Sequence, residues 1–317
     1  MFSDPDAGMT GELQRFPPLG RVLVSGGTHG NELGGVCVVK HKSSECLQRP
    51  SFTTQTVISN PRATERGVRQ IDTDLNRCFS AEILGQCESV DSPYEVQRAL
   101  ELNRTFGPRG SEHAVDFICD LHNTSANTQS CLIAGLPTDF LSLQAARYLQ
   151  SVSKQPCHIL VMKRNAPAFT LMTIGKHFLT IEMGPQSPGV IRADIYNKTL
   201  THLQNLLDWI ELFNTGTEFQ AAEVECFEVH EKIDYPRDSE GHITACIHSE
   251  LQDRDFEPLN PGDPIFQPFD GGDPIIFQGQ QTLYPVFVNE SAYYSKGIAF
   301  WTTRKITLAL PSISVKG

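Results

Sequence analysis

The sequence between residues 21 and 40 is RVLVSGGTHGNELGGVCVVK. It opens with a β-branched run at 21–24, reaches the glycine pair Gly26-Gly27, and continues over 33–40 in an apolar pattern typical of a helix. A short strand that leads through a glycine-rich loop into a helix is the repeating unit of an α/β fold. This stretch therefore predicts an α/β protein.

The same alternation fills the first two thirds of the chain. Short apolar runs bounded by turn residues predict strands at 56–59, 115–121, 158–162 and 179–182. Longer patterns with apolar residues near the helical period predict helices at 93–106, 140–152 and 192–213. This order predicts a mostly parallel sheet flanked by crossover helices.

The pattern of the sequence changes near residue 214. Short β-rich segments follow, separated by turn signals that begin at Asp238, Asn260 and Asp270. We therefore expect an α/β domain over 21–213 and a smaller β-rich domain over 214–317. The acidic and proline-rich residues 1–20 are expected to form a loose leader.

Composition and charge exclude several classes of function. Of 317 residues, 39% are hydrophobic and 20% charged, which is typical of a globular protein. A formal net charge of -11 argues against nucleic acid as a partner, because phosphate backbones would be repelled. No apolar run is long enough to cross a bilayer. Nine cysteines without a Cys-x-x-Cys pair favour reduced thiols and a cytoplasmic location. The oligomeric state is open, and a homo-oligomer is compatible with the sequence.

Two segments carry candidate metal ligands. His29 lies in the loop after the first strand, and Glu32 stands at the start of the next helix. His122 ends the 115–121 strand, and Asp120 shares its strand face and so can orient its imidazole. Two histidines and a carboxylate are a common ligand set of catalytic zinc sites. Each segment alone also fits a blander interpretation, a glycine-rich turn or a polar strand end. A phosphate loop is disfavoured because its glycine motifs are absent.

Further polar residues suit catalysis and anion binding. Glu182 ends an apolar strand, where low polarity raises a carboxyl pKa toward the range useful for acid and base work, although it also fits an ordinary strand end. Asp72, Asp74, Asn76 and Arg77 form a cluster that is either a solvated turn or a grip on an anion. Arg69 and Arg77 would let an acidic protein hold an acidic substrate, because a guanidinium binds a carboxylate bidentately.

These motifs, taken in order, resemble one known family. The chain carries Gly26-Gly-Thr-His-Gly-Asn-Glu, Asn60-Pro-Arg, Asp74-Leu-Asn-Arg, Asp120-Leu-His-Asn-Thr, Glu182-Met-Gly-Pro-Gln, Asp234-Tyr-Pro-Arg, Pro261-Gly-Asp-Pro and Tyr284-Pro-Val-Phe-Val-Asn-Glu-Ser-Ala-Tyr-Tyr. Over residues 21–310 it is similar to the aspartoacylase and aminoacylase III family. The resemblance implies a zinc carboxypeptidase-like mixed sheet flanked by helices, with a C-terminal β domain that narrows the channel.

The resemblance also implies roles for single residues. One zinc ion per subunit would be held by His29, Glu32 and His122, and Glu182 would move the proton from water to the leaving amine. Arg69 would stabilise the oxyanion and contact the substrate. The substrate's free carboxylate would be bound by Asn76 and Arg77, and Tyr293 would also contact the substrate.

The chain departs from the aspartate-specific members at two positions. Those members have an arginine ten residues before the catalytic glutamate and a tyrosine fourteen before it, where this chain has Met172 and Ala168. A shift of the alignment would instead bring Lys163 or Arg164 to the arginine position. Without a shift, the departure favours the aminoacylase III branch, which deacetylates N-acetyl aromatic amino acids and mercapturic acids.

Other functions remain as alternatives. An aspartoacylase acting on N-acetyl-L-aspartate is the first alternative, and a metallocarboxypeptidase is another, against which the C-terminal β domain argues. A zinc-binding interaction protein without activity would have no need of Glu182 or Arg69. The sequence therefore predicts a zinc amidohydrolase that acts on small N-acyl amino acids.

Overall fold

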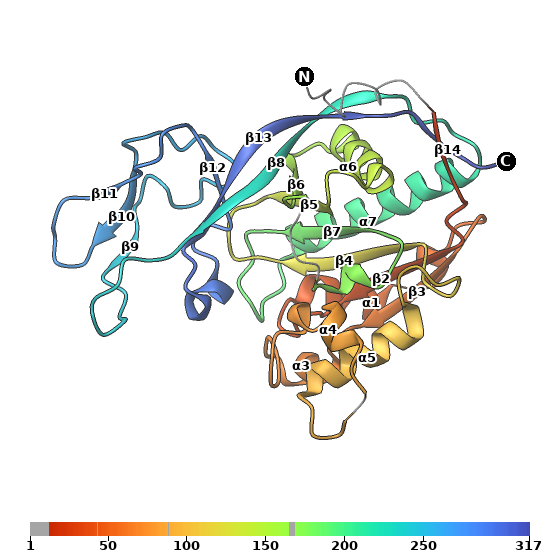
Figure 1. Cartoon of the computed structure of the whole chain (residues 1–317), viewed down its shortest axis with the longest axis horizontal. Coiled ribbons are helices and arrows are strands. Elements are labelled where there is room, and N and C mark those ends of the chain that lie inside the picture. Colours follow the sequence, from red (N-terminus) through yellow and green to blue (C-terminus); the bar gives the residue numbers. More distant parts are fainter. Residues whose placement is uncertain (1–12, 43, 88, 165–168) are drawn as a thin grey trace, which may run out of the picture.

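The computed structural model describes residues 13–42, 44–87, 89–164 and 169–317. Its centre is a nine-stranded sheet (Figure 1). Across the sheet the strands are β12 (Tyr284–Val286), β13 (Phe300–Leu310), β8 (Ala222–Ile233), β6 (Cys157–Val161), β5 (Ser130–Gly135), β7 (His177–Met183), β4 (Phe117–Asn123), β2 (Arg21–Gly26) and β3 (Thr53–Ile58). Strands β3, β2, β4 and β7 run parallel, and β5, β6 and β8 run parallel to one another but antiparallel to β7. The sheet is therefore mixed, as expected.

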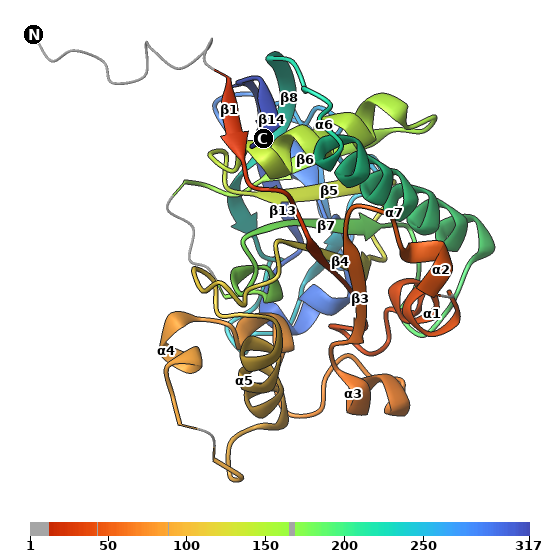
Figure 2. The ribbon, with the colours of Figure 1, turned by 90° about the vertical axis from the view of Figure 1, so that its right-hand side faces the viewer.

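Helices cover the two faces of the sheet unequally (Figure 2). One face carries α1 (Leu33–His41), α6 (Phe140–Val152) and α7 (Ala193–Asn214). The other face carries α5 (Tyr94–Phe106) and the 3₁₀ helices η1 (Leu75–Arg77) and η2 (Leu171–Thr173). Shorter helices lie in the connections: α2 (Ser44–Leu47), α3 (Pro61–Arg66), α4 (Ala81–Leu84) and η3 (Ser291–Lys296).

The predicted strands and helices of the first two thirds are all present, with ends that differ by a few residues. The strand β5 was not anticipated. Its sequence Ser-Cys-Leu-Ile-Ala-Gly is apolar but short, and a run of this length does not reveal its direction in a sheet. In the fold it lies antiparallel to β7, so the expected parallel order is interrupted there.

The expected leader is ordered in its second half. Strand β1 (Gln14–Phe16) pairs in parallel with β14 (Ile313–Val315), so the first described strand lies beside the last one. Leu19 is buried in the main core, and its amide donates to the Asn214 side chain at 2.8 Å. The interpretation of 13–20 as loose was therefore wrong, because a strand partner from the far end of the chain was not visible locally. Residues 1–12 lie outside the described chain.

The C-terminal third is β-rich, as expected. A second sheet of three strands, β9 (Ala245–Ile247), β10 (Pro264–Pro268) and β11 (Ile275–Ile276), stands at one end of the molecule (Figure 1). The long strands β8 and β13 also belong to the nine-stranded sheet, so they link this region to the α/β part. The division at residues 213 and 214 stays a prediction.

Among the residues that the structure describes, no helix is long and apolar enough to span a membrane. All nine cysteines are described, and none of them forms a disulfide. The cytoplasmic location and the homo-oligomer stay predictions.

A pocket lies on one face of the sheet, between two apolar clusters. Leu179 and Ile181 of β7 point to the face that α6 and α7 cover, whereas Phe178 points to the other face and packs under α5 and η2. On that second face a separate apolar cluster covers β6, β8 and β13 and includes Phe287 and Trp301. Between these two clusters lies a pocket of about 530 Å³.

Candidate active site

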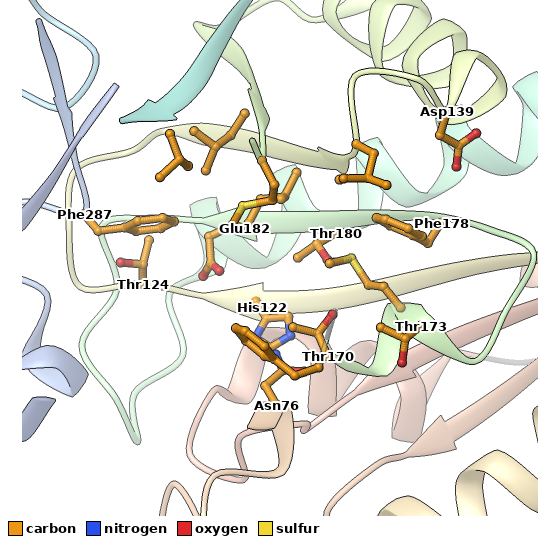
Figure 3. A pocket seen from close by; sticks show the side chains of 18 of the residues that line it. Asn76, His122, Thr124, Asp139, Thr170, Thr173, Phe178, Thr180, Glu182 and Phe287 are labelled. Atoms are coloured by element: carbon orange, nitrogen blue, oxygen red, sulfur yellow. The ribbon is translucent and has the colours of Figure 1, made fainter. Parts of the chain in front are cut away.

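The pocket collects most of the predicted site residues. His29, Glu32, His122 and Glu182 line it together with the substrate-binding candidates Arg69, Asn76, Arg77, Met172 and Tyr293. Figure 3 shows Glu182 above His122, with Asn76 and Thr170 on the near side. Asp120 is not a lining residue, because it lies behind His122 as a buried hydrogen-bond partner. Segments that are far apart in sequence therefore converge on one cavity.

The loop between β2 and α1 presents His29 and Glu32 because glycine lets it pass close to a neighbouring loop. Gly27 has a φ of +70°, which glycine adopts at little cost. At Gly30 a Cβ atom would lie 2.2 Å from the carbonyl carbon of Ala63, so only glycine fits. The amide of Gly30 donates to the Arg69 carbonyl at 3.1 Å, which joins this loop to the segment that carries Arg69.

Strand β4 delivers His122 at its carboxyl end. His122 pairs with Glu182 of β7 in the sheet register, so the two side chains rise from neighbouring strands. Its Nε2 lies 2.8 Å from Asp120 Oδ2, and Asp120 Oδ1 accepts from the Thr28 hydroxyl at 2.9 Å. The buried Asp120 carboxylate thus fixes the imidazole with Nδ1 toward the cavity.

His29, Glu32 and His122 form a group that is able to hold a metal ion. One donor atom from each lies within 4.8 Å of the others, and all three residues are buried. The Nδ1 atoms of His29 and His122 lie 2.6 Å and 2.8 Å from the two Glu32 oxygens. Burial alone would raise the pKa of Glu32, but the two imidazoles lower it well below its usual value, so the carboxylate is ionised. Two imidazole nitrogens and a carboxylate suit a transition metal such as zinc.

His29 Nε2 lies 2.8 Å from Arg69 Nη2 and also faces the Asp74 carboxylate. Asp74 contacts His29 and two cations. Its Oδ1 lies 3.1 Å from His29 Nε2, and Oδ2 accepts from Lys296 Nζ at 2.5 Å. Arg69 Nη2 lies 3.4 Å from the same carboxylate. These cations and His29 hold the pKa of Asp74 far below its usual value despite burial. The sequence predicted that Asp74 belongs either to a solvated turn or to a grip on an anion, and no local signal paired it with His29 or Lys296.

Glu182 has the electrostatic environment predicted for an acid–base group. Its carboxylate makes no hydrogen bond to any residue that the structure describes. Burial raises the pKa of Glu182 to about 8, with Glu32 and Glu290 adding to the rise and His122 and Arg69 opposing it. A carboxyl with a pKa in this range exchanges protons near neutral pH. A bound cation would lower this pKa.

Arg69 and Arg77 bring positive charge to the pocket of an acidic protein. Arg69 Nη1 donates to Glu32 Oε1 at 3.1 Å, so its guanidinium lies beside the metal-binding group. Arg77 is exposed, stacks on Phe169 with 4.8 Å between its Cζ and the ring centre, and lies next to Asn76 on η1. Lys232 also lines the pocket. These cations are able to pair with an anionic group of a ligand.

The helix η3 closes the pocket from the C-terminal third. The Tyr293 ring stacks on Trp301 at a centroid distance of 5.9 Å. At the start of η3, Glu290 accepts hydrogen bonds from the Thr124 hydroxyl and from the Ser125 amide, just after His122. At its end, Lys296 binds Asp74. Glu290 belongs to one of the family motifs, but neither its role nor that of Lys296 was predicted, because their partners lie more than 160 residues away.

A buried glutamate holds the loop that carries the arginines. Glu95 is fully buried, and its carboxylate accepts from the amides of Ile71 at 2.6 Å, Asp72 at 3.0 Å and Thr73 at 3.1 Å. The Asn60 side chain donates to it at 3.0 Å. Glu95 thereby fixes the backbone between Arg69 and Asn76. Sequence reasoning missed it, because a glutamate in the first turn of a helix is ordinary.

Met172 stands at the position where aspartate-specific relatives were expected to have an arginine that binds the side-chain carboxylate of the substrate. It lines the pocket, and its Sδ accepts from the Thr180 hydroxyl at 2.9 Å. Lys163 and Arg164 are exposed and are not among the residues that line the pocket. Ala168, the other position of the departure, lies outside the described residues.

Two family models match the chain. The succinylglutamate desuccinylase/aspartoacylase catalytic domain matches residues 18–210, and the AstE/AspA barrel-sandwich hybrid domain matches residues 222–305. The chain belongs to the succinylglutamate desuccinylase/aspartoacylase family. The predicted fold is confirmed by the same matches and by the crystal structure of murine aminoacylase 3, which superposes with a TM-score of 0.90. That structure is 41% identical, and the match covers 94% of this chain and 99% of the murine one.

Curated members of the family differ in their named activity. The human N-acyl-aromatic-L-amino acid amidohydrolase (carboxylate-forming) is 45% identical over 300 residues, covering 93% of this chain and 94% of the human one. An aspartoacylase of Danio rerio is 44% identical over 297 residues, covering 92% and 94%. These identities are nearly equal, so overall similarity does not select a substrate. The residues that line the pocket must decide it.

Proposed function

We propose that this chain is a zinc-dependent amidohydrolase of N-acyl-L-amino acids with aromatic or S-conjugated cysteine side chains, the latter being mercapturic acids. It releases a carboxylate, mainly acetate, and the free amino acid. The observation that carries the proposal is the junction, in one pocket, of the His29, Glu32 and His122 group with Glu182 and Arg69. Residues 21–213 hold this machinery, residues 214–317 narrow its channel, and the enzyme works in the cytoplasm.

The metal of the proposal is one zinc ion per subunit, held by His29, Glu32 and His122. The donor set supports zinc, since two imidazoles and one carboxylate leave a coordination position free. When bound, zinc supplies Lewis-acid polarisation of the acyl carbonyl and activation of water. Asp120 keeps His122 in the tautomer that leaves Nδ1 unprotonated, because its carboxylate faces Nε2. The Nε2 atom of His29 contacts both Asp74 Oδ1 at 3.1 Å and Arg69 Nη2 at 2.8 Å.

Glu182 is the acid–base group of the proposal. Its carboxylate takes a proton from the attacking water and returns it to the amine nitrogen as the amide bond breaks. Burial raises the pKa of Glu182 to about 8 in the metal-free protein, and a bound zinc ion would lower it from there. A carboxyl whose pKa lies near neutral pH gains and loses a proton at small cost. The absence of a hydrogen bond to any described residue leaves both oxygens available to substrate and water.

Arg69, Asn76, Arg77 and Tyr293 bind the substrate in this proposal. Arg69 stabilises the charge that develops on the acyl oxygen, and its contacts with Glu32 and Asp74 hold it in place. Arg77 binds the free carboxylate with help from Asn76, since a guanidinium matches a carboxylate in charge and shape. Tyr293 forms one wall of the acyl site. A free carboxylate on the substrate explains why an acidic protein keeps cations at this pocket.

The side chain of the substrate lies against Met172 in this proposal. Methionine is flexible and polarizable, so it adapts to rings and thioethers. An acidic side chain at the same place would lose its hydration without gaining a cation from Met172 or Thr180. Aromatic and S-substituted side chains are therefore preferred over aspartate.

An aspartoacylase activity is the second candidate. The aspartoacylase of Danio rerio favours it, because it matches nearly as well as the human enzyme. Lys232 is the cation that would serve a side-chain carboxylate, but it is exposed and its Nζ lies 5.2 Å from the centre of the Trp301 ring. A metallocarboxypeptidase would need room for a longer peptide, and a zinc-binding protein without activity would not need Glu182.

A substrate comparison tests the proposal. The protein is assayed with N-acetyl-L-tyrosine, N-acetyl-S-benzyl-L-cysteine and N-acetyl-L-aspartate, before and after removal of metal with a chelator and after reloading with zinc. We expect the first two to be hydrolysed with kcat/KM at least tenfold above the third, and only with metal. Equal or better turnover of N-acetyl-L-aspartate would make the protein an aspartoacylase instead.

A further inference from the structure

The pocket extends well past the proposed site, along strand β7. Glu182, Thr180 and Phe178 alternate onto the same face of this strand and all line the cavity (Figure 3). His177, at the start of β7, also lines it. Glu182 lies five residue steps beyond His177 in the strand, which corresponds to about 17 Å at the usual rise per residue. The cavity is therefore longer than the proposed substrates need.

The far end of this cavity is walled mainly by apolar groups. We call it the distal subsite and define it by Phe16, Leu136, Asp139, Phe140 and His177, all of which line the pocket. The ring centres of Phe16 and His177 lie 5.8 Å apart in an edge-to-face contact. Strand β1 and helix α6 thus meet the beginning of β7 there.

The polar groups of the distal subsite are already bound to one another. Asp139 Oδ1 lies 2.9 Å from His177 Nδ1, and the same carboxylate accepts from the Ser142 amide and hydroxyl. Arg109, which also lines the pocket, donates to the Lys176 carbonyl at 3.0 Å. The Asp139 and His177 side chains thus satisfy each other, and the apolar side chains of Phe16, Leu136 and Phe140 favour an apolar ligand that displaces water.

Phe178 does not divide the cavity, because a glycine lies beneath its ring. A Cβ atom at Gly135 would lie 2.1 Å from Phe178 Cζ, so the ring occupies the space that a side chain on β5 would fill. Gly135 also has a φ of +74°, which disfavours other residues. The ring therefore lies against the sheet, and the cavity remains continuous from Glu182 to the distal subsite.

We propose that the distal subsite binds the terminal apolar group of an elongated substrate side chain. The substrate class is N-acyl-L-cysteine S-conjugates with long alkyl or arylalkyl substituents. This proposal rests on the proposed function, which puts the substrate side chain against Met172. Thr180 lies between Glu182 and Phe178 along β7 (Figure 3), and its hydroxyl donates to Met172 Sδ at 2.9 Å. A longer side chain that lies against Met172 therefore continues past Thr180 toward the distal subsite.

A chain-length series tests the proposal with the zinc-loaded enzyme. kcat/KM is measured for N-acetyl-S-alkyl-L-cysteines from methyl to octyl, with N-acetyl-L-tyrosine as reference. Burial of each further methylene should raise kcat/KM by up to about fourfold, and the rise should continue beyond butyl. A parallel series with longer acyl chains on tyrosine should give no such rise.

A blocking variant locates the effect. Leu136→Trp fills the distal subsite, and Leu212→Trp is the matched control, because Leu212 lies on α7 outside the pocket and is similarly exposed, 39% against 36%. The readout is the ratio of kcat/KM for the octyl and methyl conjugates, which is insensitive to a uniform loss of activity. We expect Leu136→Trp to lower this ratio at least tenfold and Leu212→Trp to leave it unchanged.

Three results would overturn the proposal. They are a kcat/KM that stops rising at ethyl or propyl, an unchanged ratio in Leu136→Trp, and a gain with longer acyl chains instead of longer side chains. If Leu136→Trp does not fold, the same octyl-to-methyl ratio of kcat/KM is measured for Phe140→Ala, which widens the distal subsite. Failure of the proposed function itself would look different, because N-acetyl-L-tyrosine and the methyl conjugate would then not be hydrolysed at all.

Discussion

Asp120→Asn tests how the protein tunes its metal site. The Asp120 carboxylate is buried and accepts two hydrogen bonds, from His122 Nε2 at 2.8 Å and from the Thr28 hydroxyl at 2.9 Å. An asparagine is nearly isosteric and keeps one acceptor oxygen. The Thr28 hydroxyl can turn to accept from the new amide, and it has Ser25 Oγ at 3.4 Å as another partner. The hydrogen bonds of Asp120 are thus replaced in the variant, and only the negative charge beside His122 Nε2 is lost.

The magnitude follows from that exchange. A hydrogen bond to a charged group contributes about 1.5–3 kcal/mol and a neutral one about 0.5–1.5 kcal/mol, so the variant loses about 1–1.5 kcal/mol of support for the metal-bound imidazole. This corresponds to a zinc dissociation constant raised about tenfold. Asp120→Ala, which removes both hydrogen bonds, should raise it about a hundredfold.

A competition titration against a chromophoric chelator measures these dissociation constants. Asp116→Asn is the matched control, since Asp116 lies just before the same strand and binds Arg21 and Lys176 away from the metal group. We expect its zinc affinity to stay within about twofold of the unaltered protein. An Asp120→Asn variant with unchanged affinity, and the same thermal stability as the control, would refute the role of Asp120.

Four further predictions address the remaining parts of the site. Glu182→Gln should retain zinc but lower kcat by about 10²–10⁴-fold, and normal turnover would remove Glu182 from the mechanism. In the metal-free protein, the pKa of Glu182 is raised from 4.5 to about 8, so the folded state binds this proton more tightly than the unfolded state does. The free energy of unfolding therefore falls as pH rises through this range, and denaturant titrations should show a flatter pH dependence for Glu182→Gln. Glu95→Gln places an amide group against the backbone N–H donors of residues 71–73 and should raise KM more than about tenfold. Glu101→Gln, an exposed position on the same helix, is the control and should leave KM unchanged, and equal KM values for the two variants would contradict the positioning role of Glu95. Met172→Arg should raise kcat/KM for N-acetyl-L-aspartate relative to N-acetyl-L-tyrosine by about tenfold or more, measured with both substrates; Met172→Leu is its control and should leave this ratio unchanged.

The sequence predicted those parts of the fold whose cause is local. Strand β2, the glycine-rich loop and α1 follow each other within twenty residues, and each has its own signal in side-chain period or turn chemistry. The pair His29 and Glu32 belongs to that unit, and His122 ends a strand that is apolar throughout. Because parallel strands end at one edge of a sheet, these ligands were expected to meet.

The parts that were missed depend on contacts between distant segments. Whether β5 runs parallel or antiparallel to β7 is decided by the whole sheet, and β1 forms only because β14 lies beside it. Lys296 reaches Asp74 across 222 positions, so no local pattern marks the pair. Glu95 binds backbone amides, which are the same for every sequence and leave no trace in side-chain type.

The central claim is that one zinc ion at His29, Glu32 and His122 makes this chain an amidohydrolase. The most direct test titrates metal-free protein with zinc while the release of acetate from N-acetyl-L-tyrosine is measured. We predict that activity rises linearly and saturates at one zinc per chain, and that a folded His29→Ala/His122→Ala double variant neither binds zinc stoichiometrically nor releases acetate. Stoichiometric zinc with full turnover in that double variant would contradict the account.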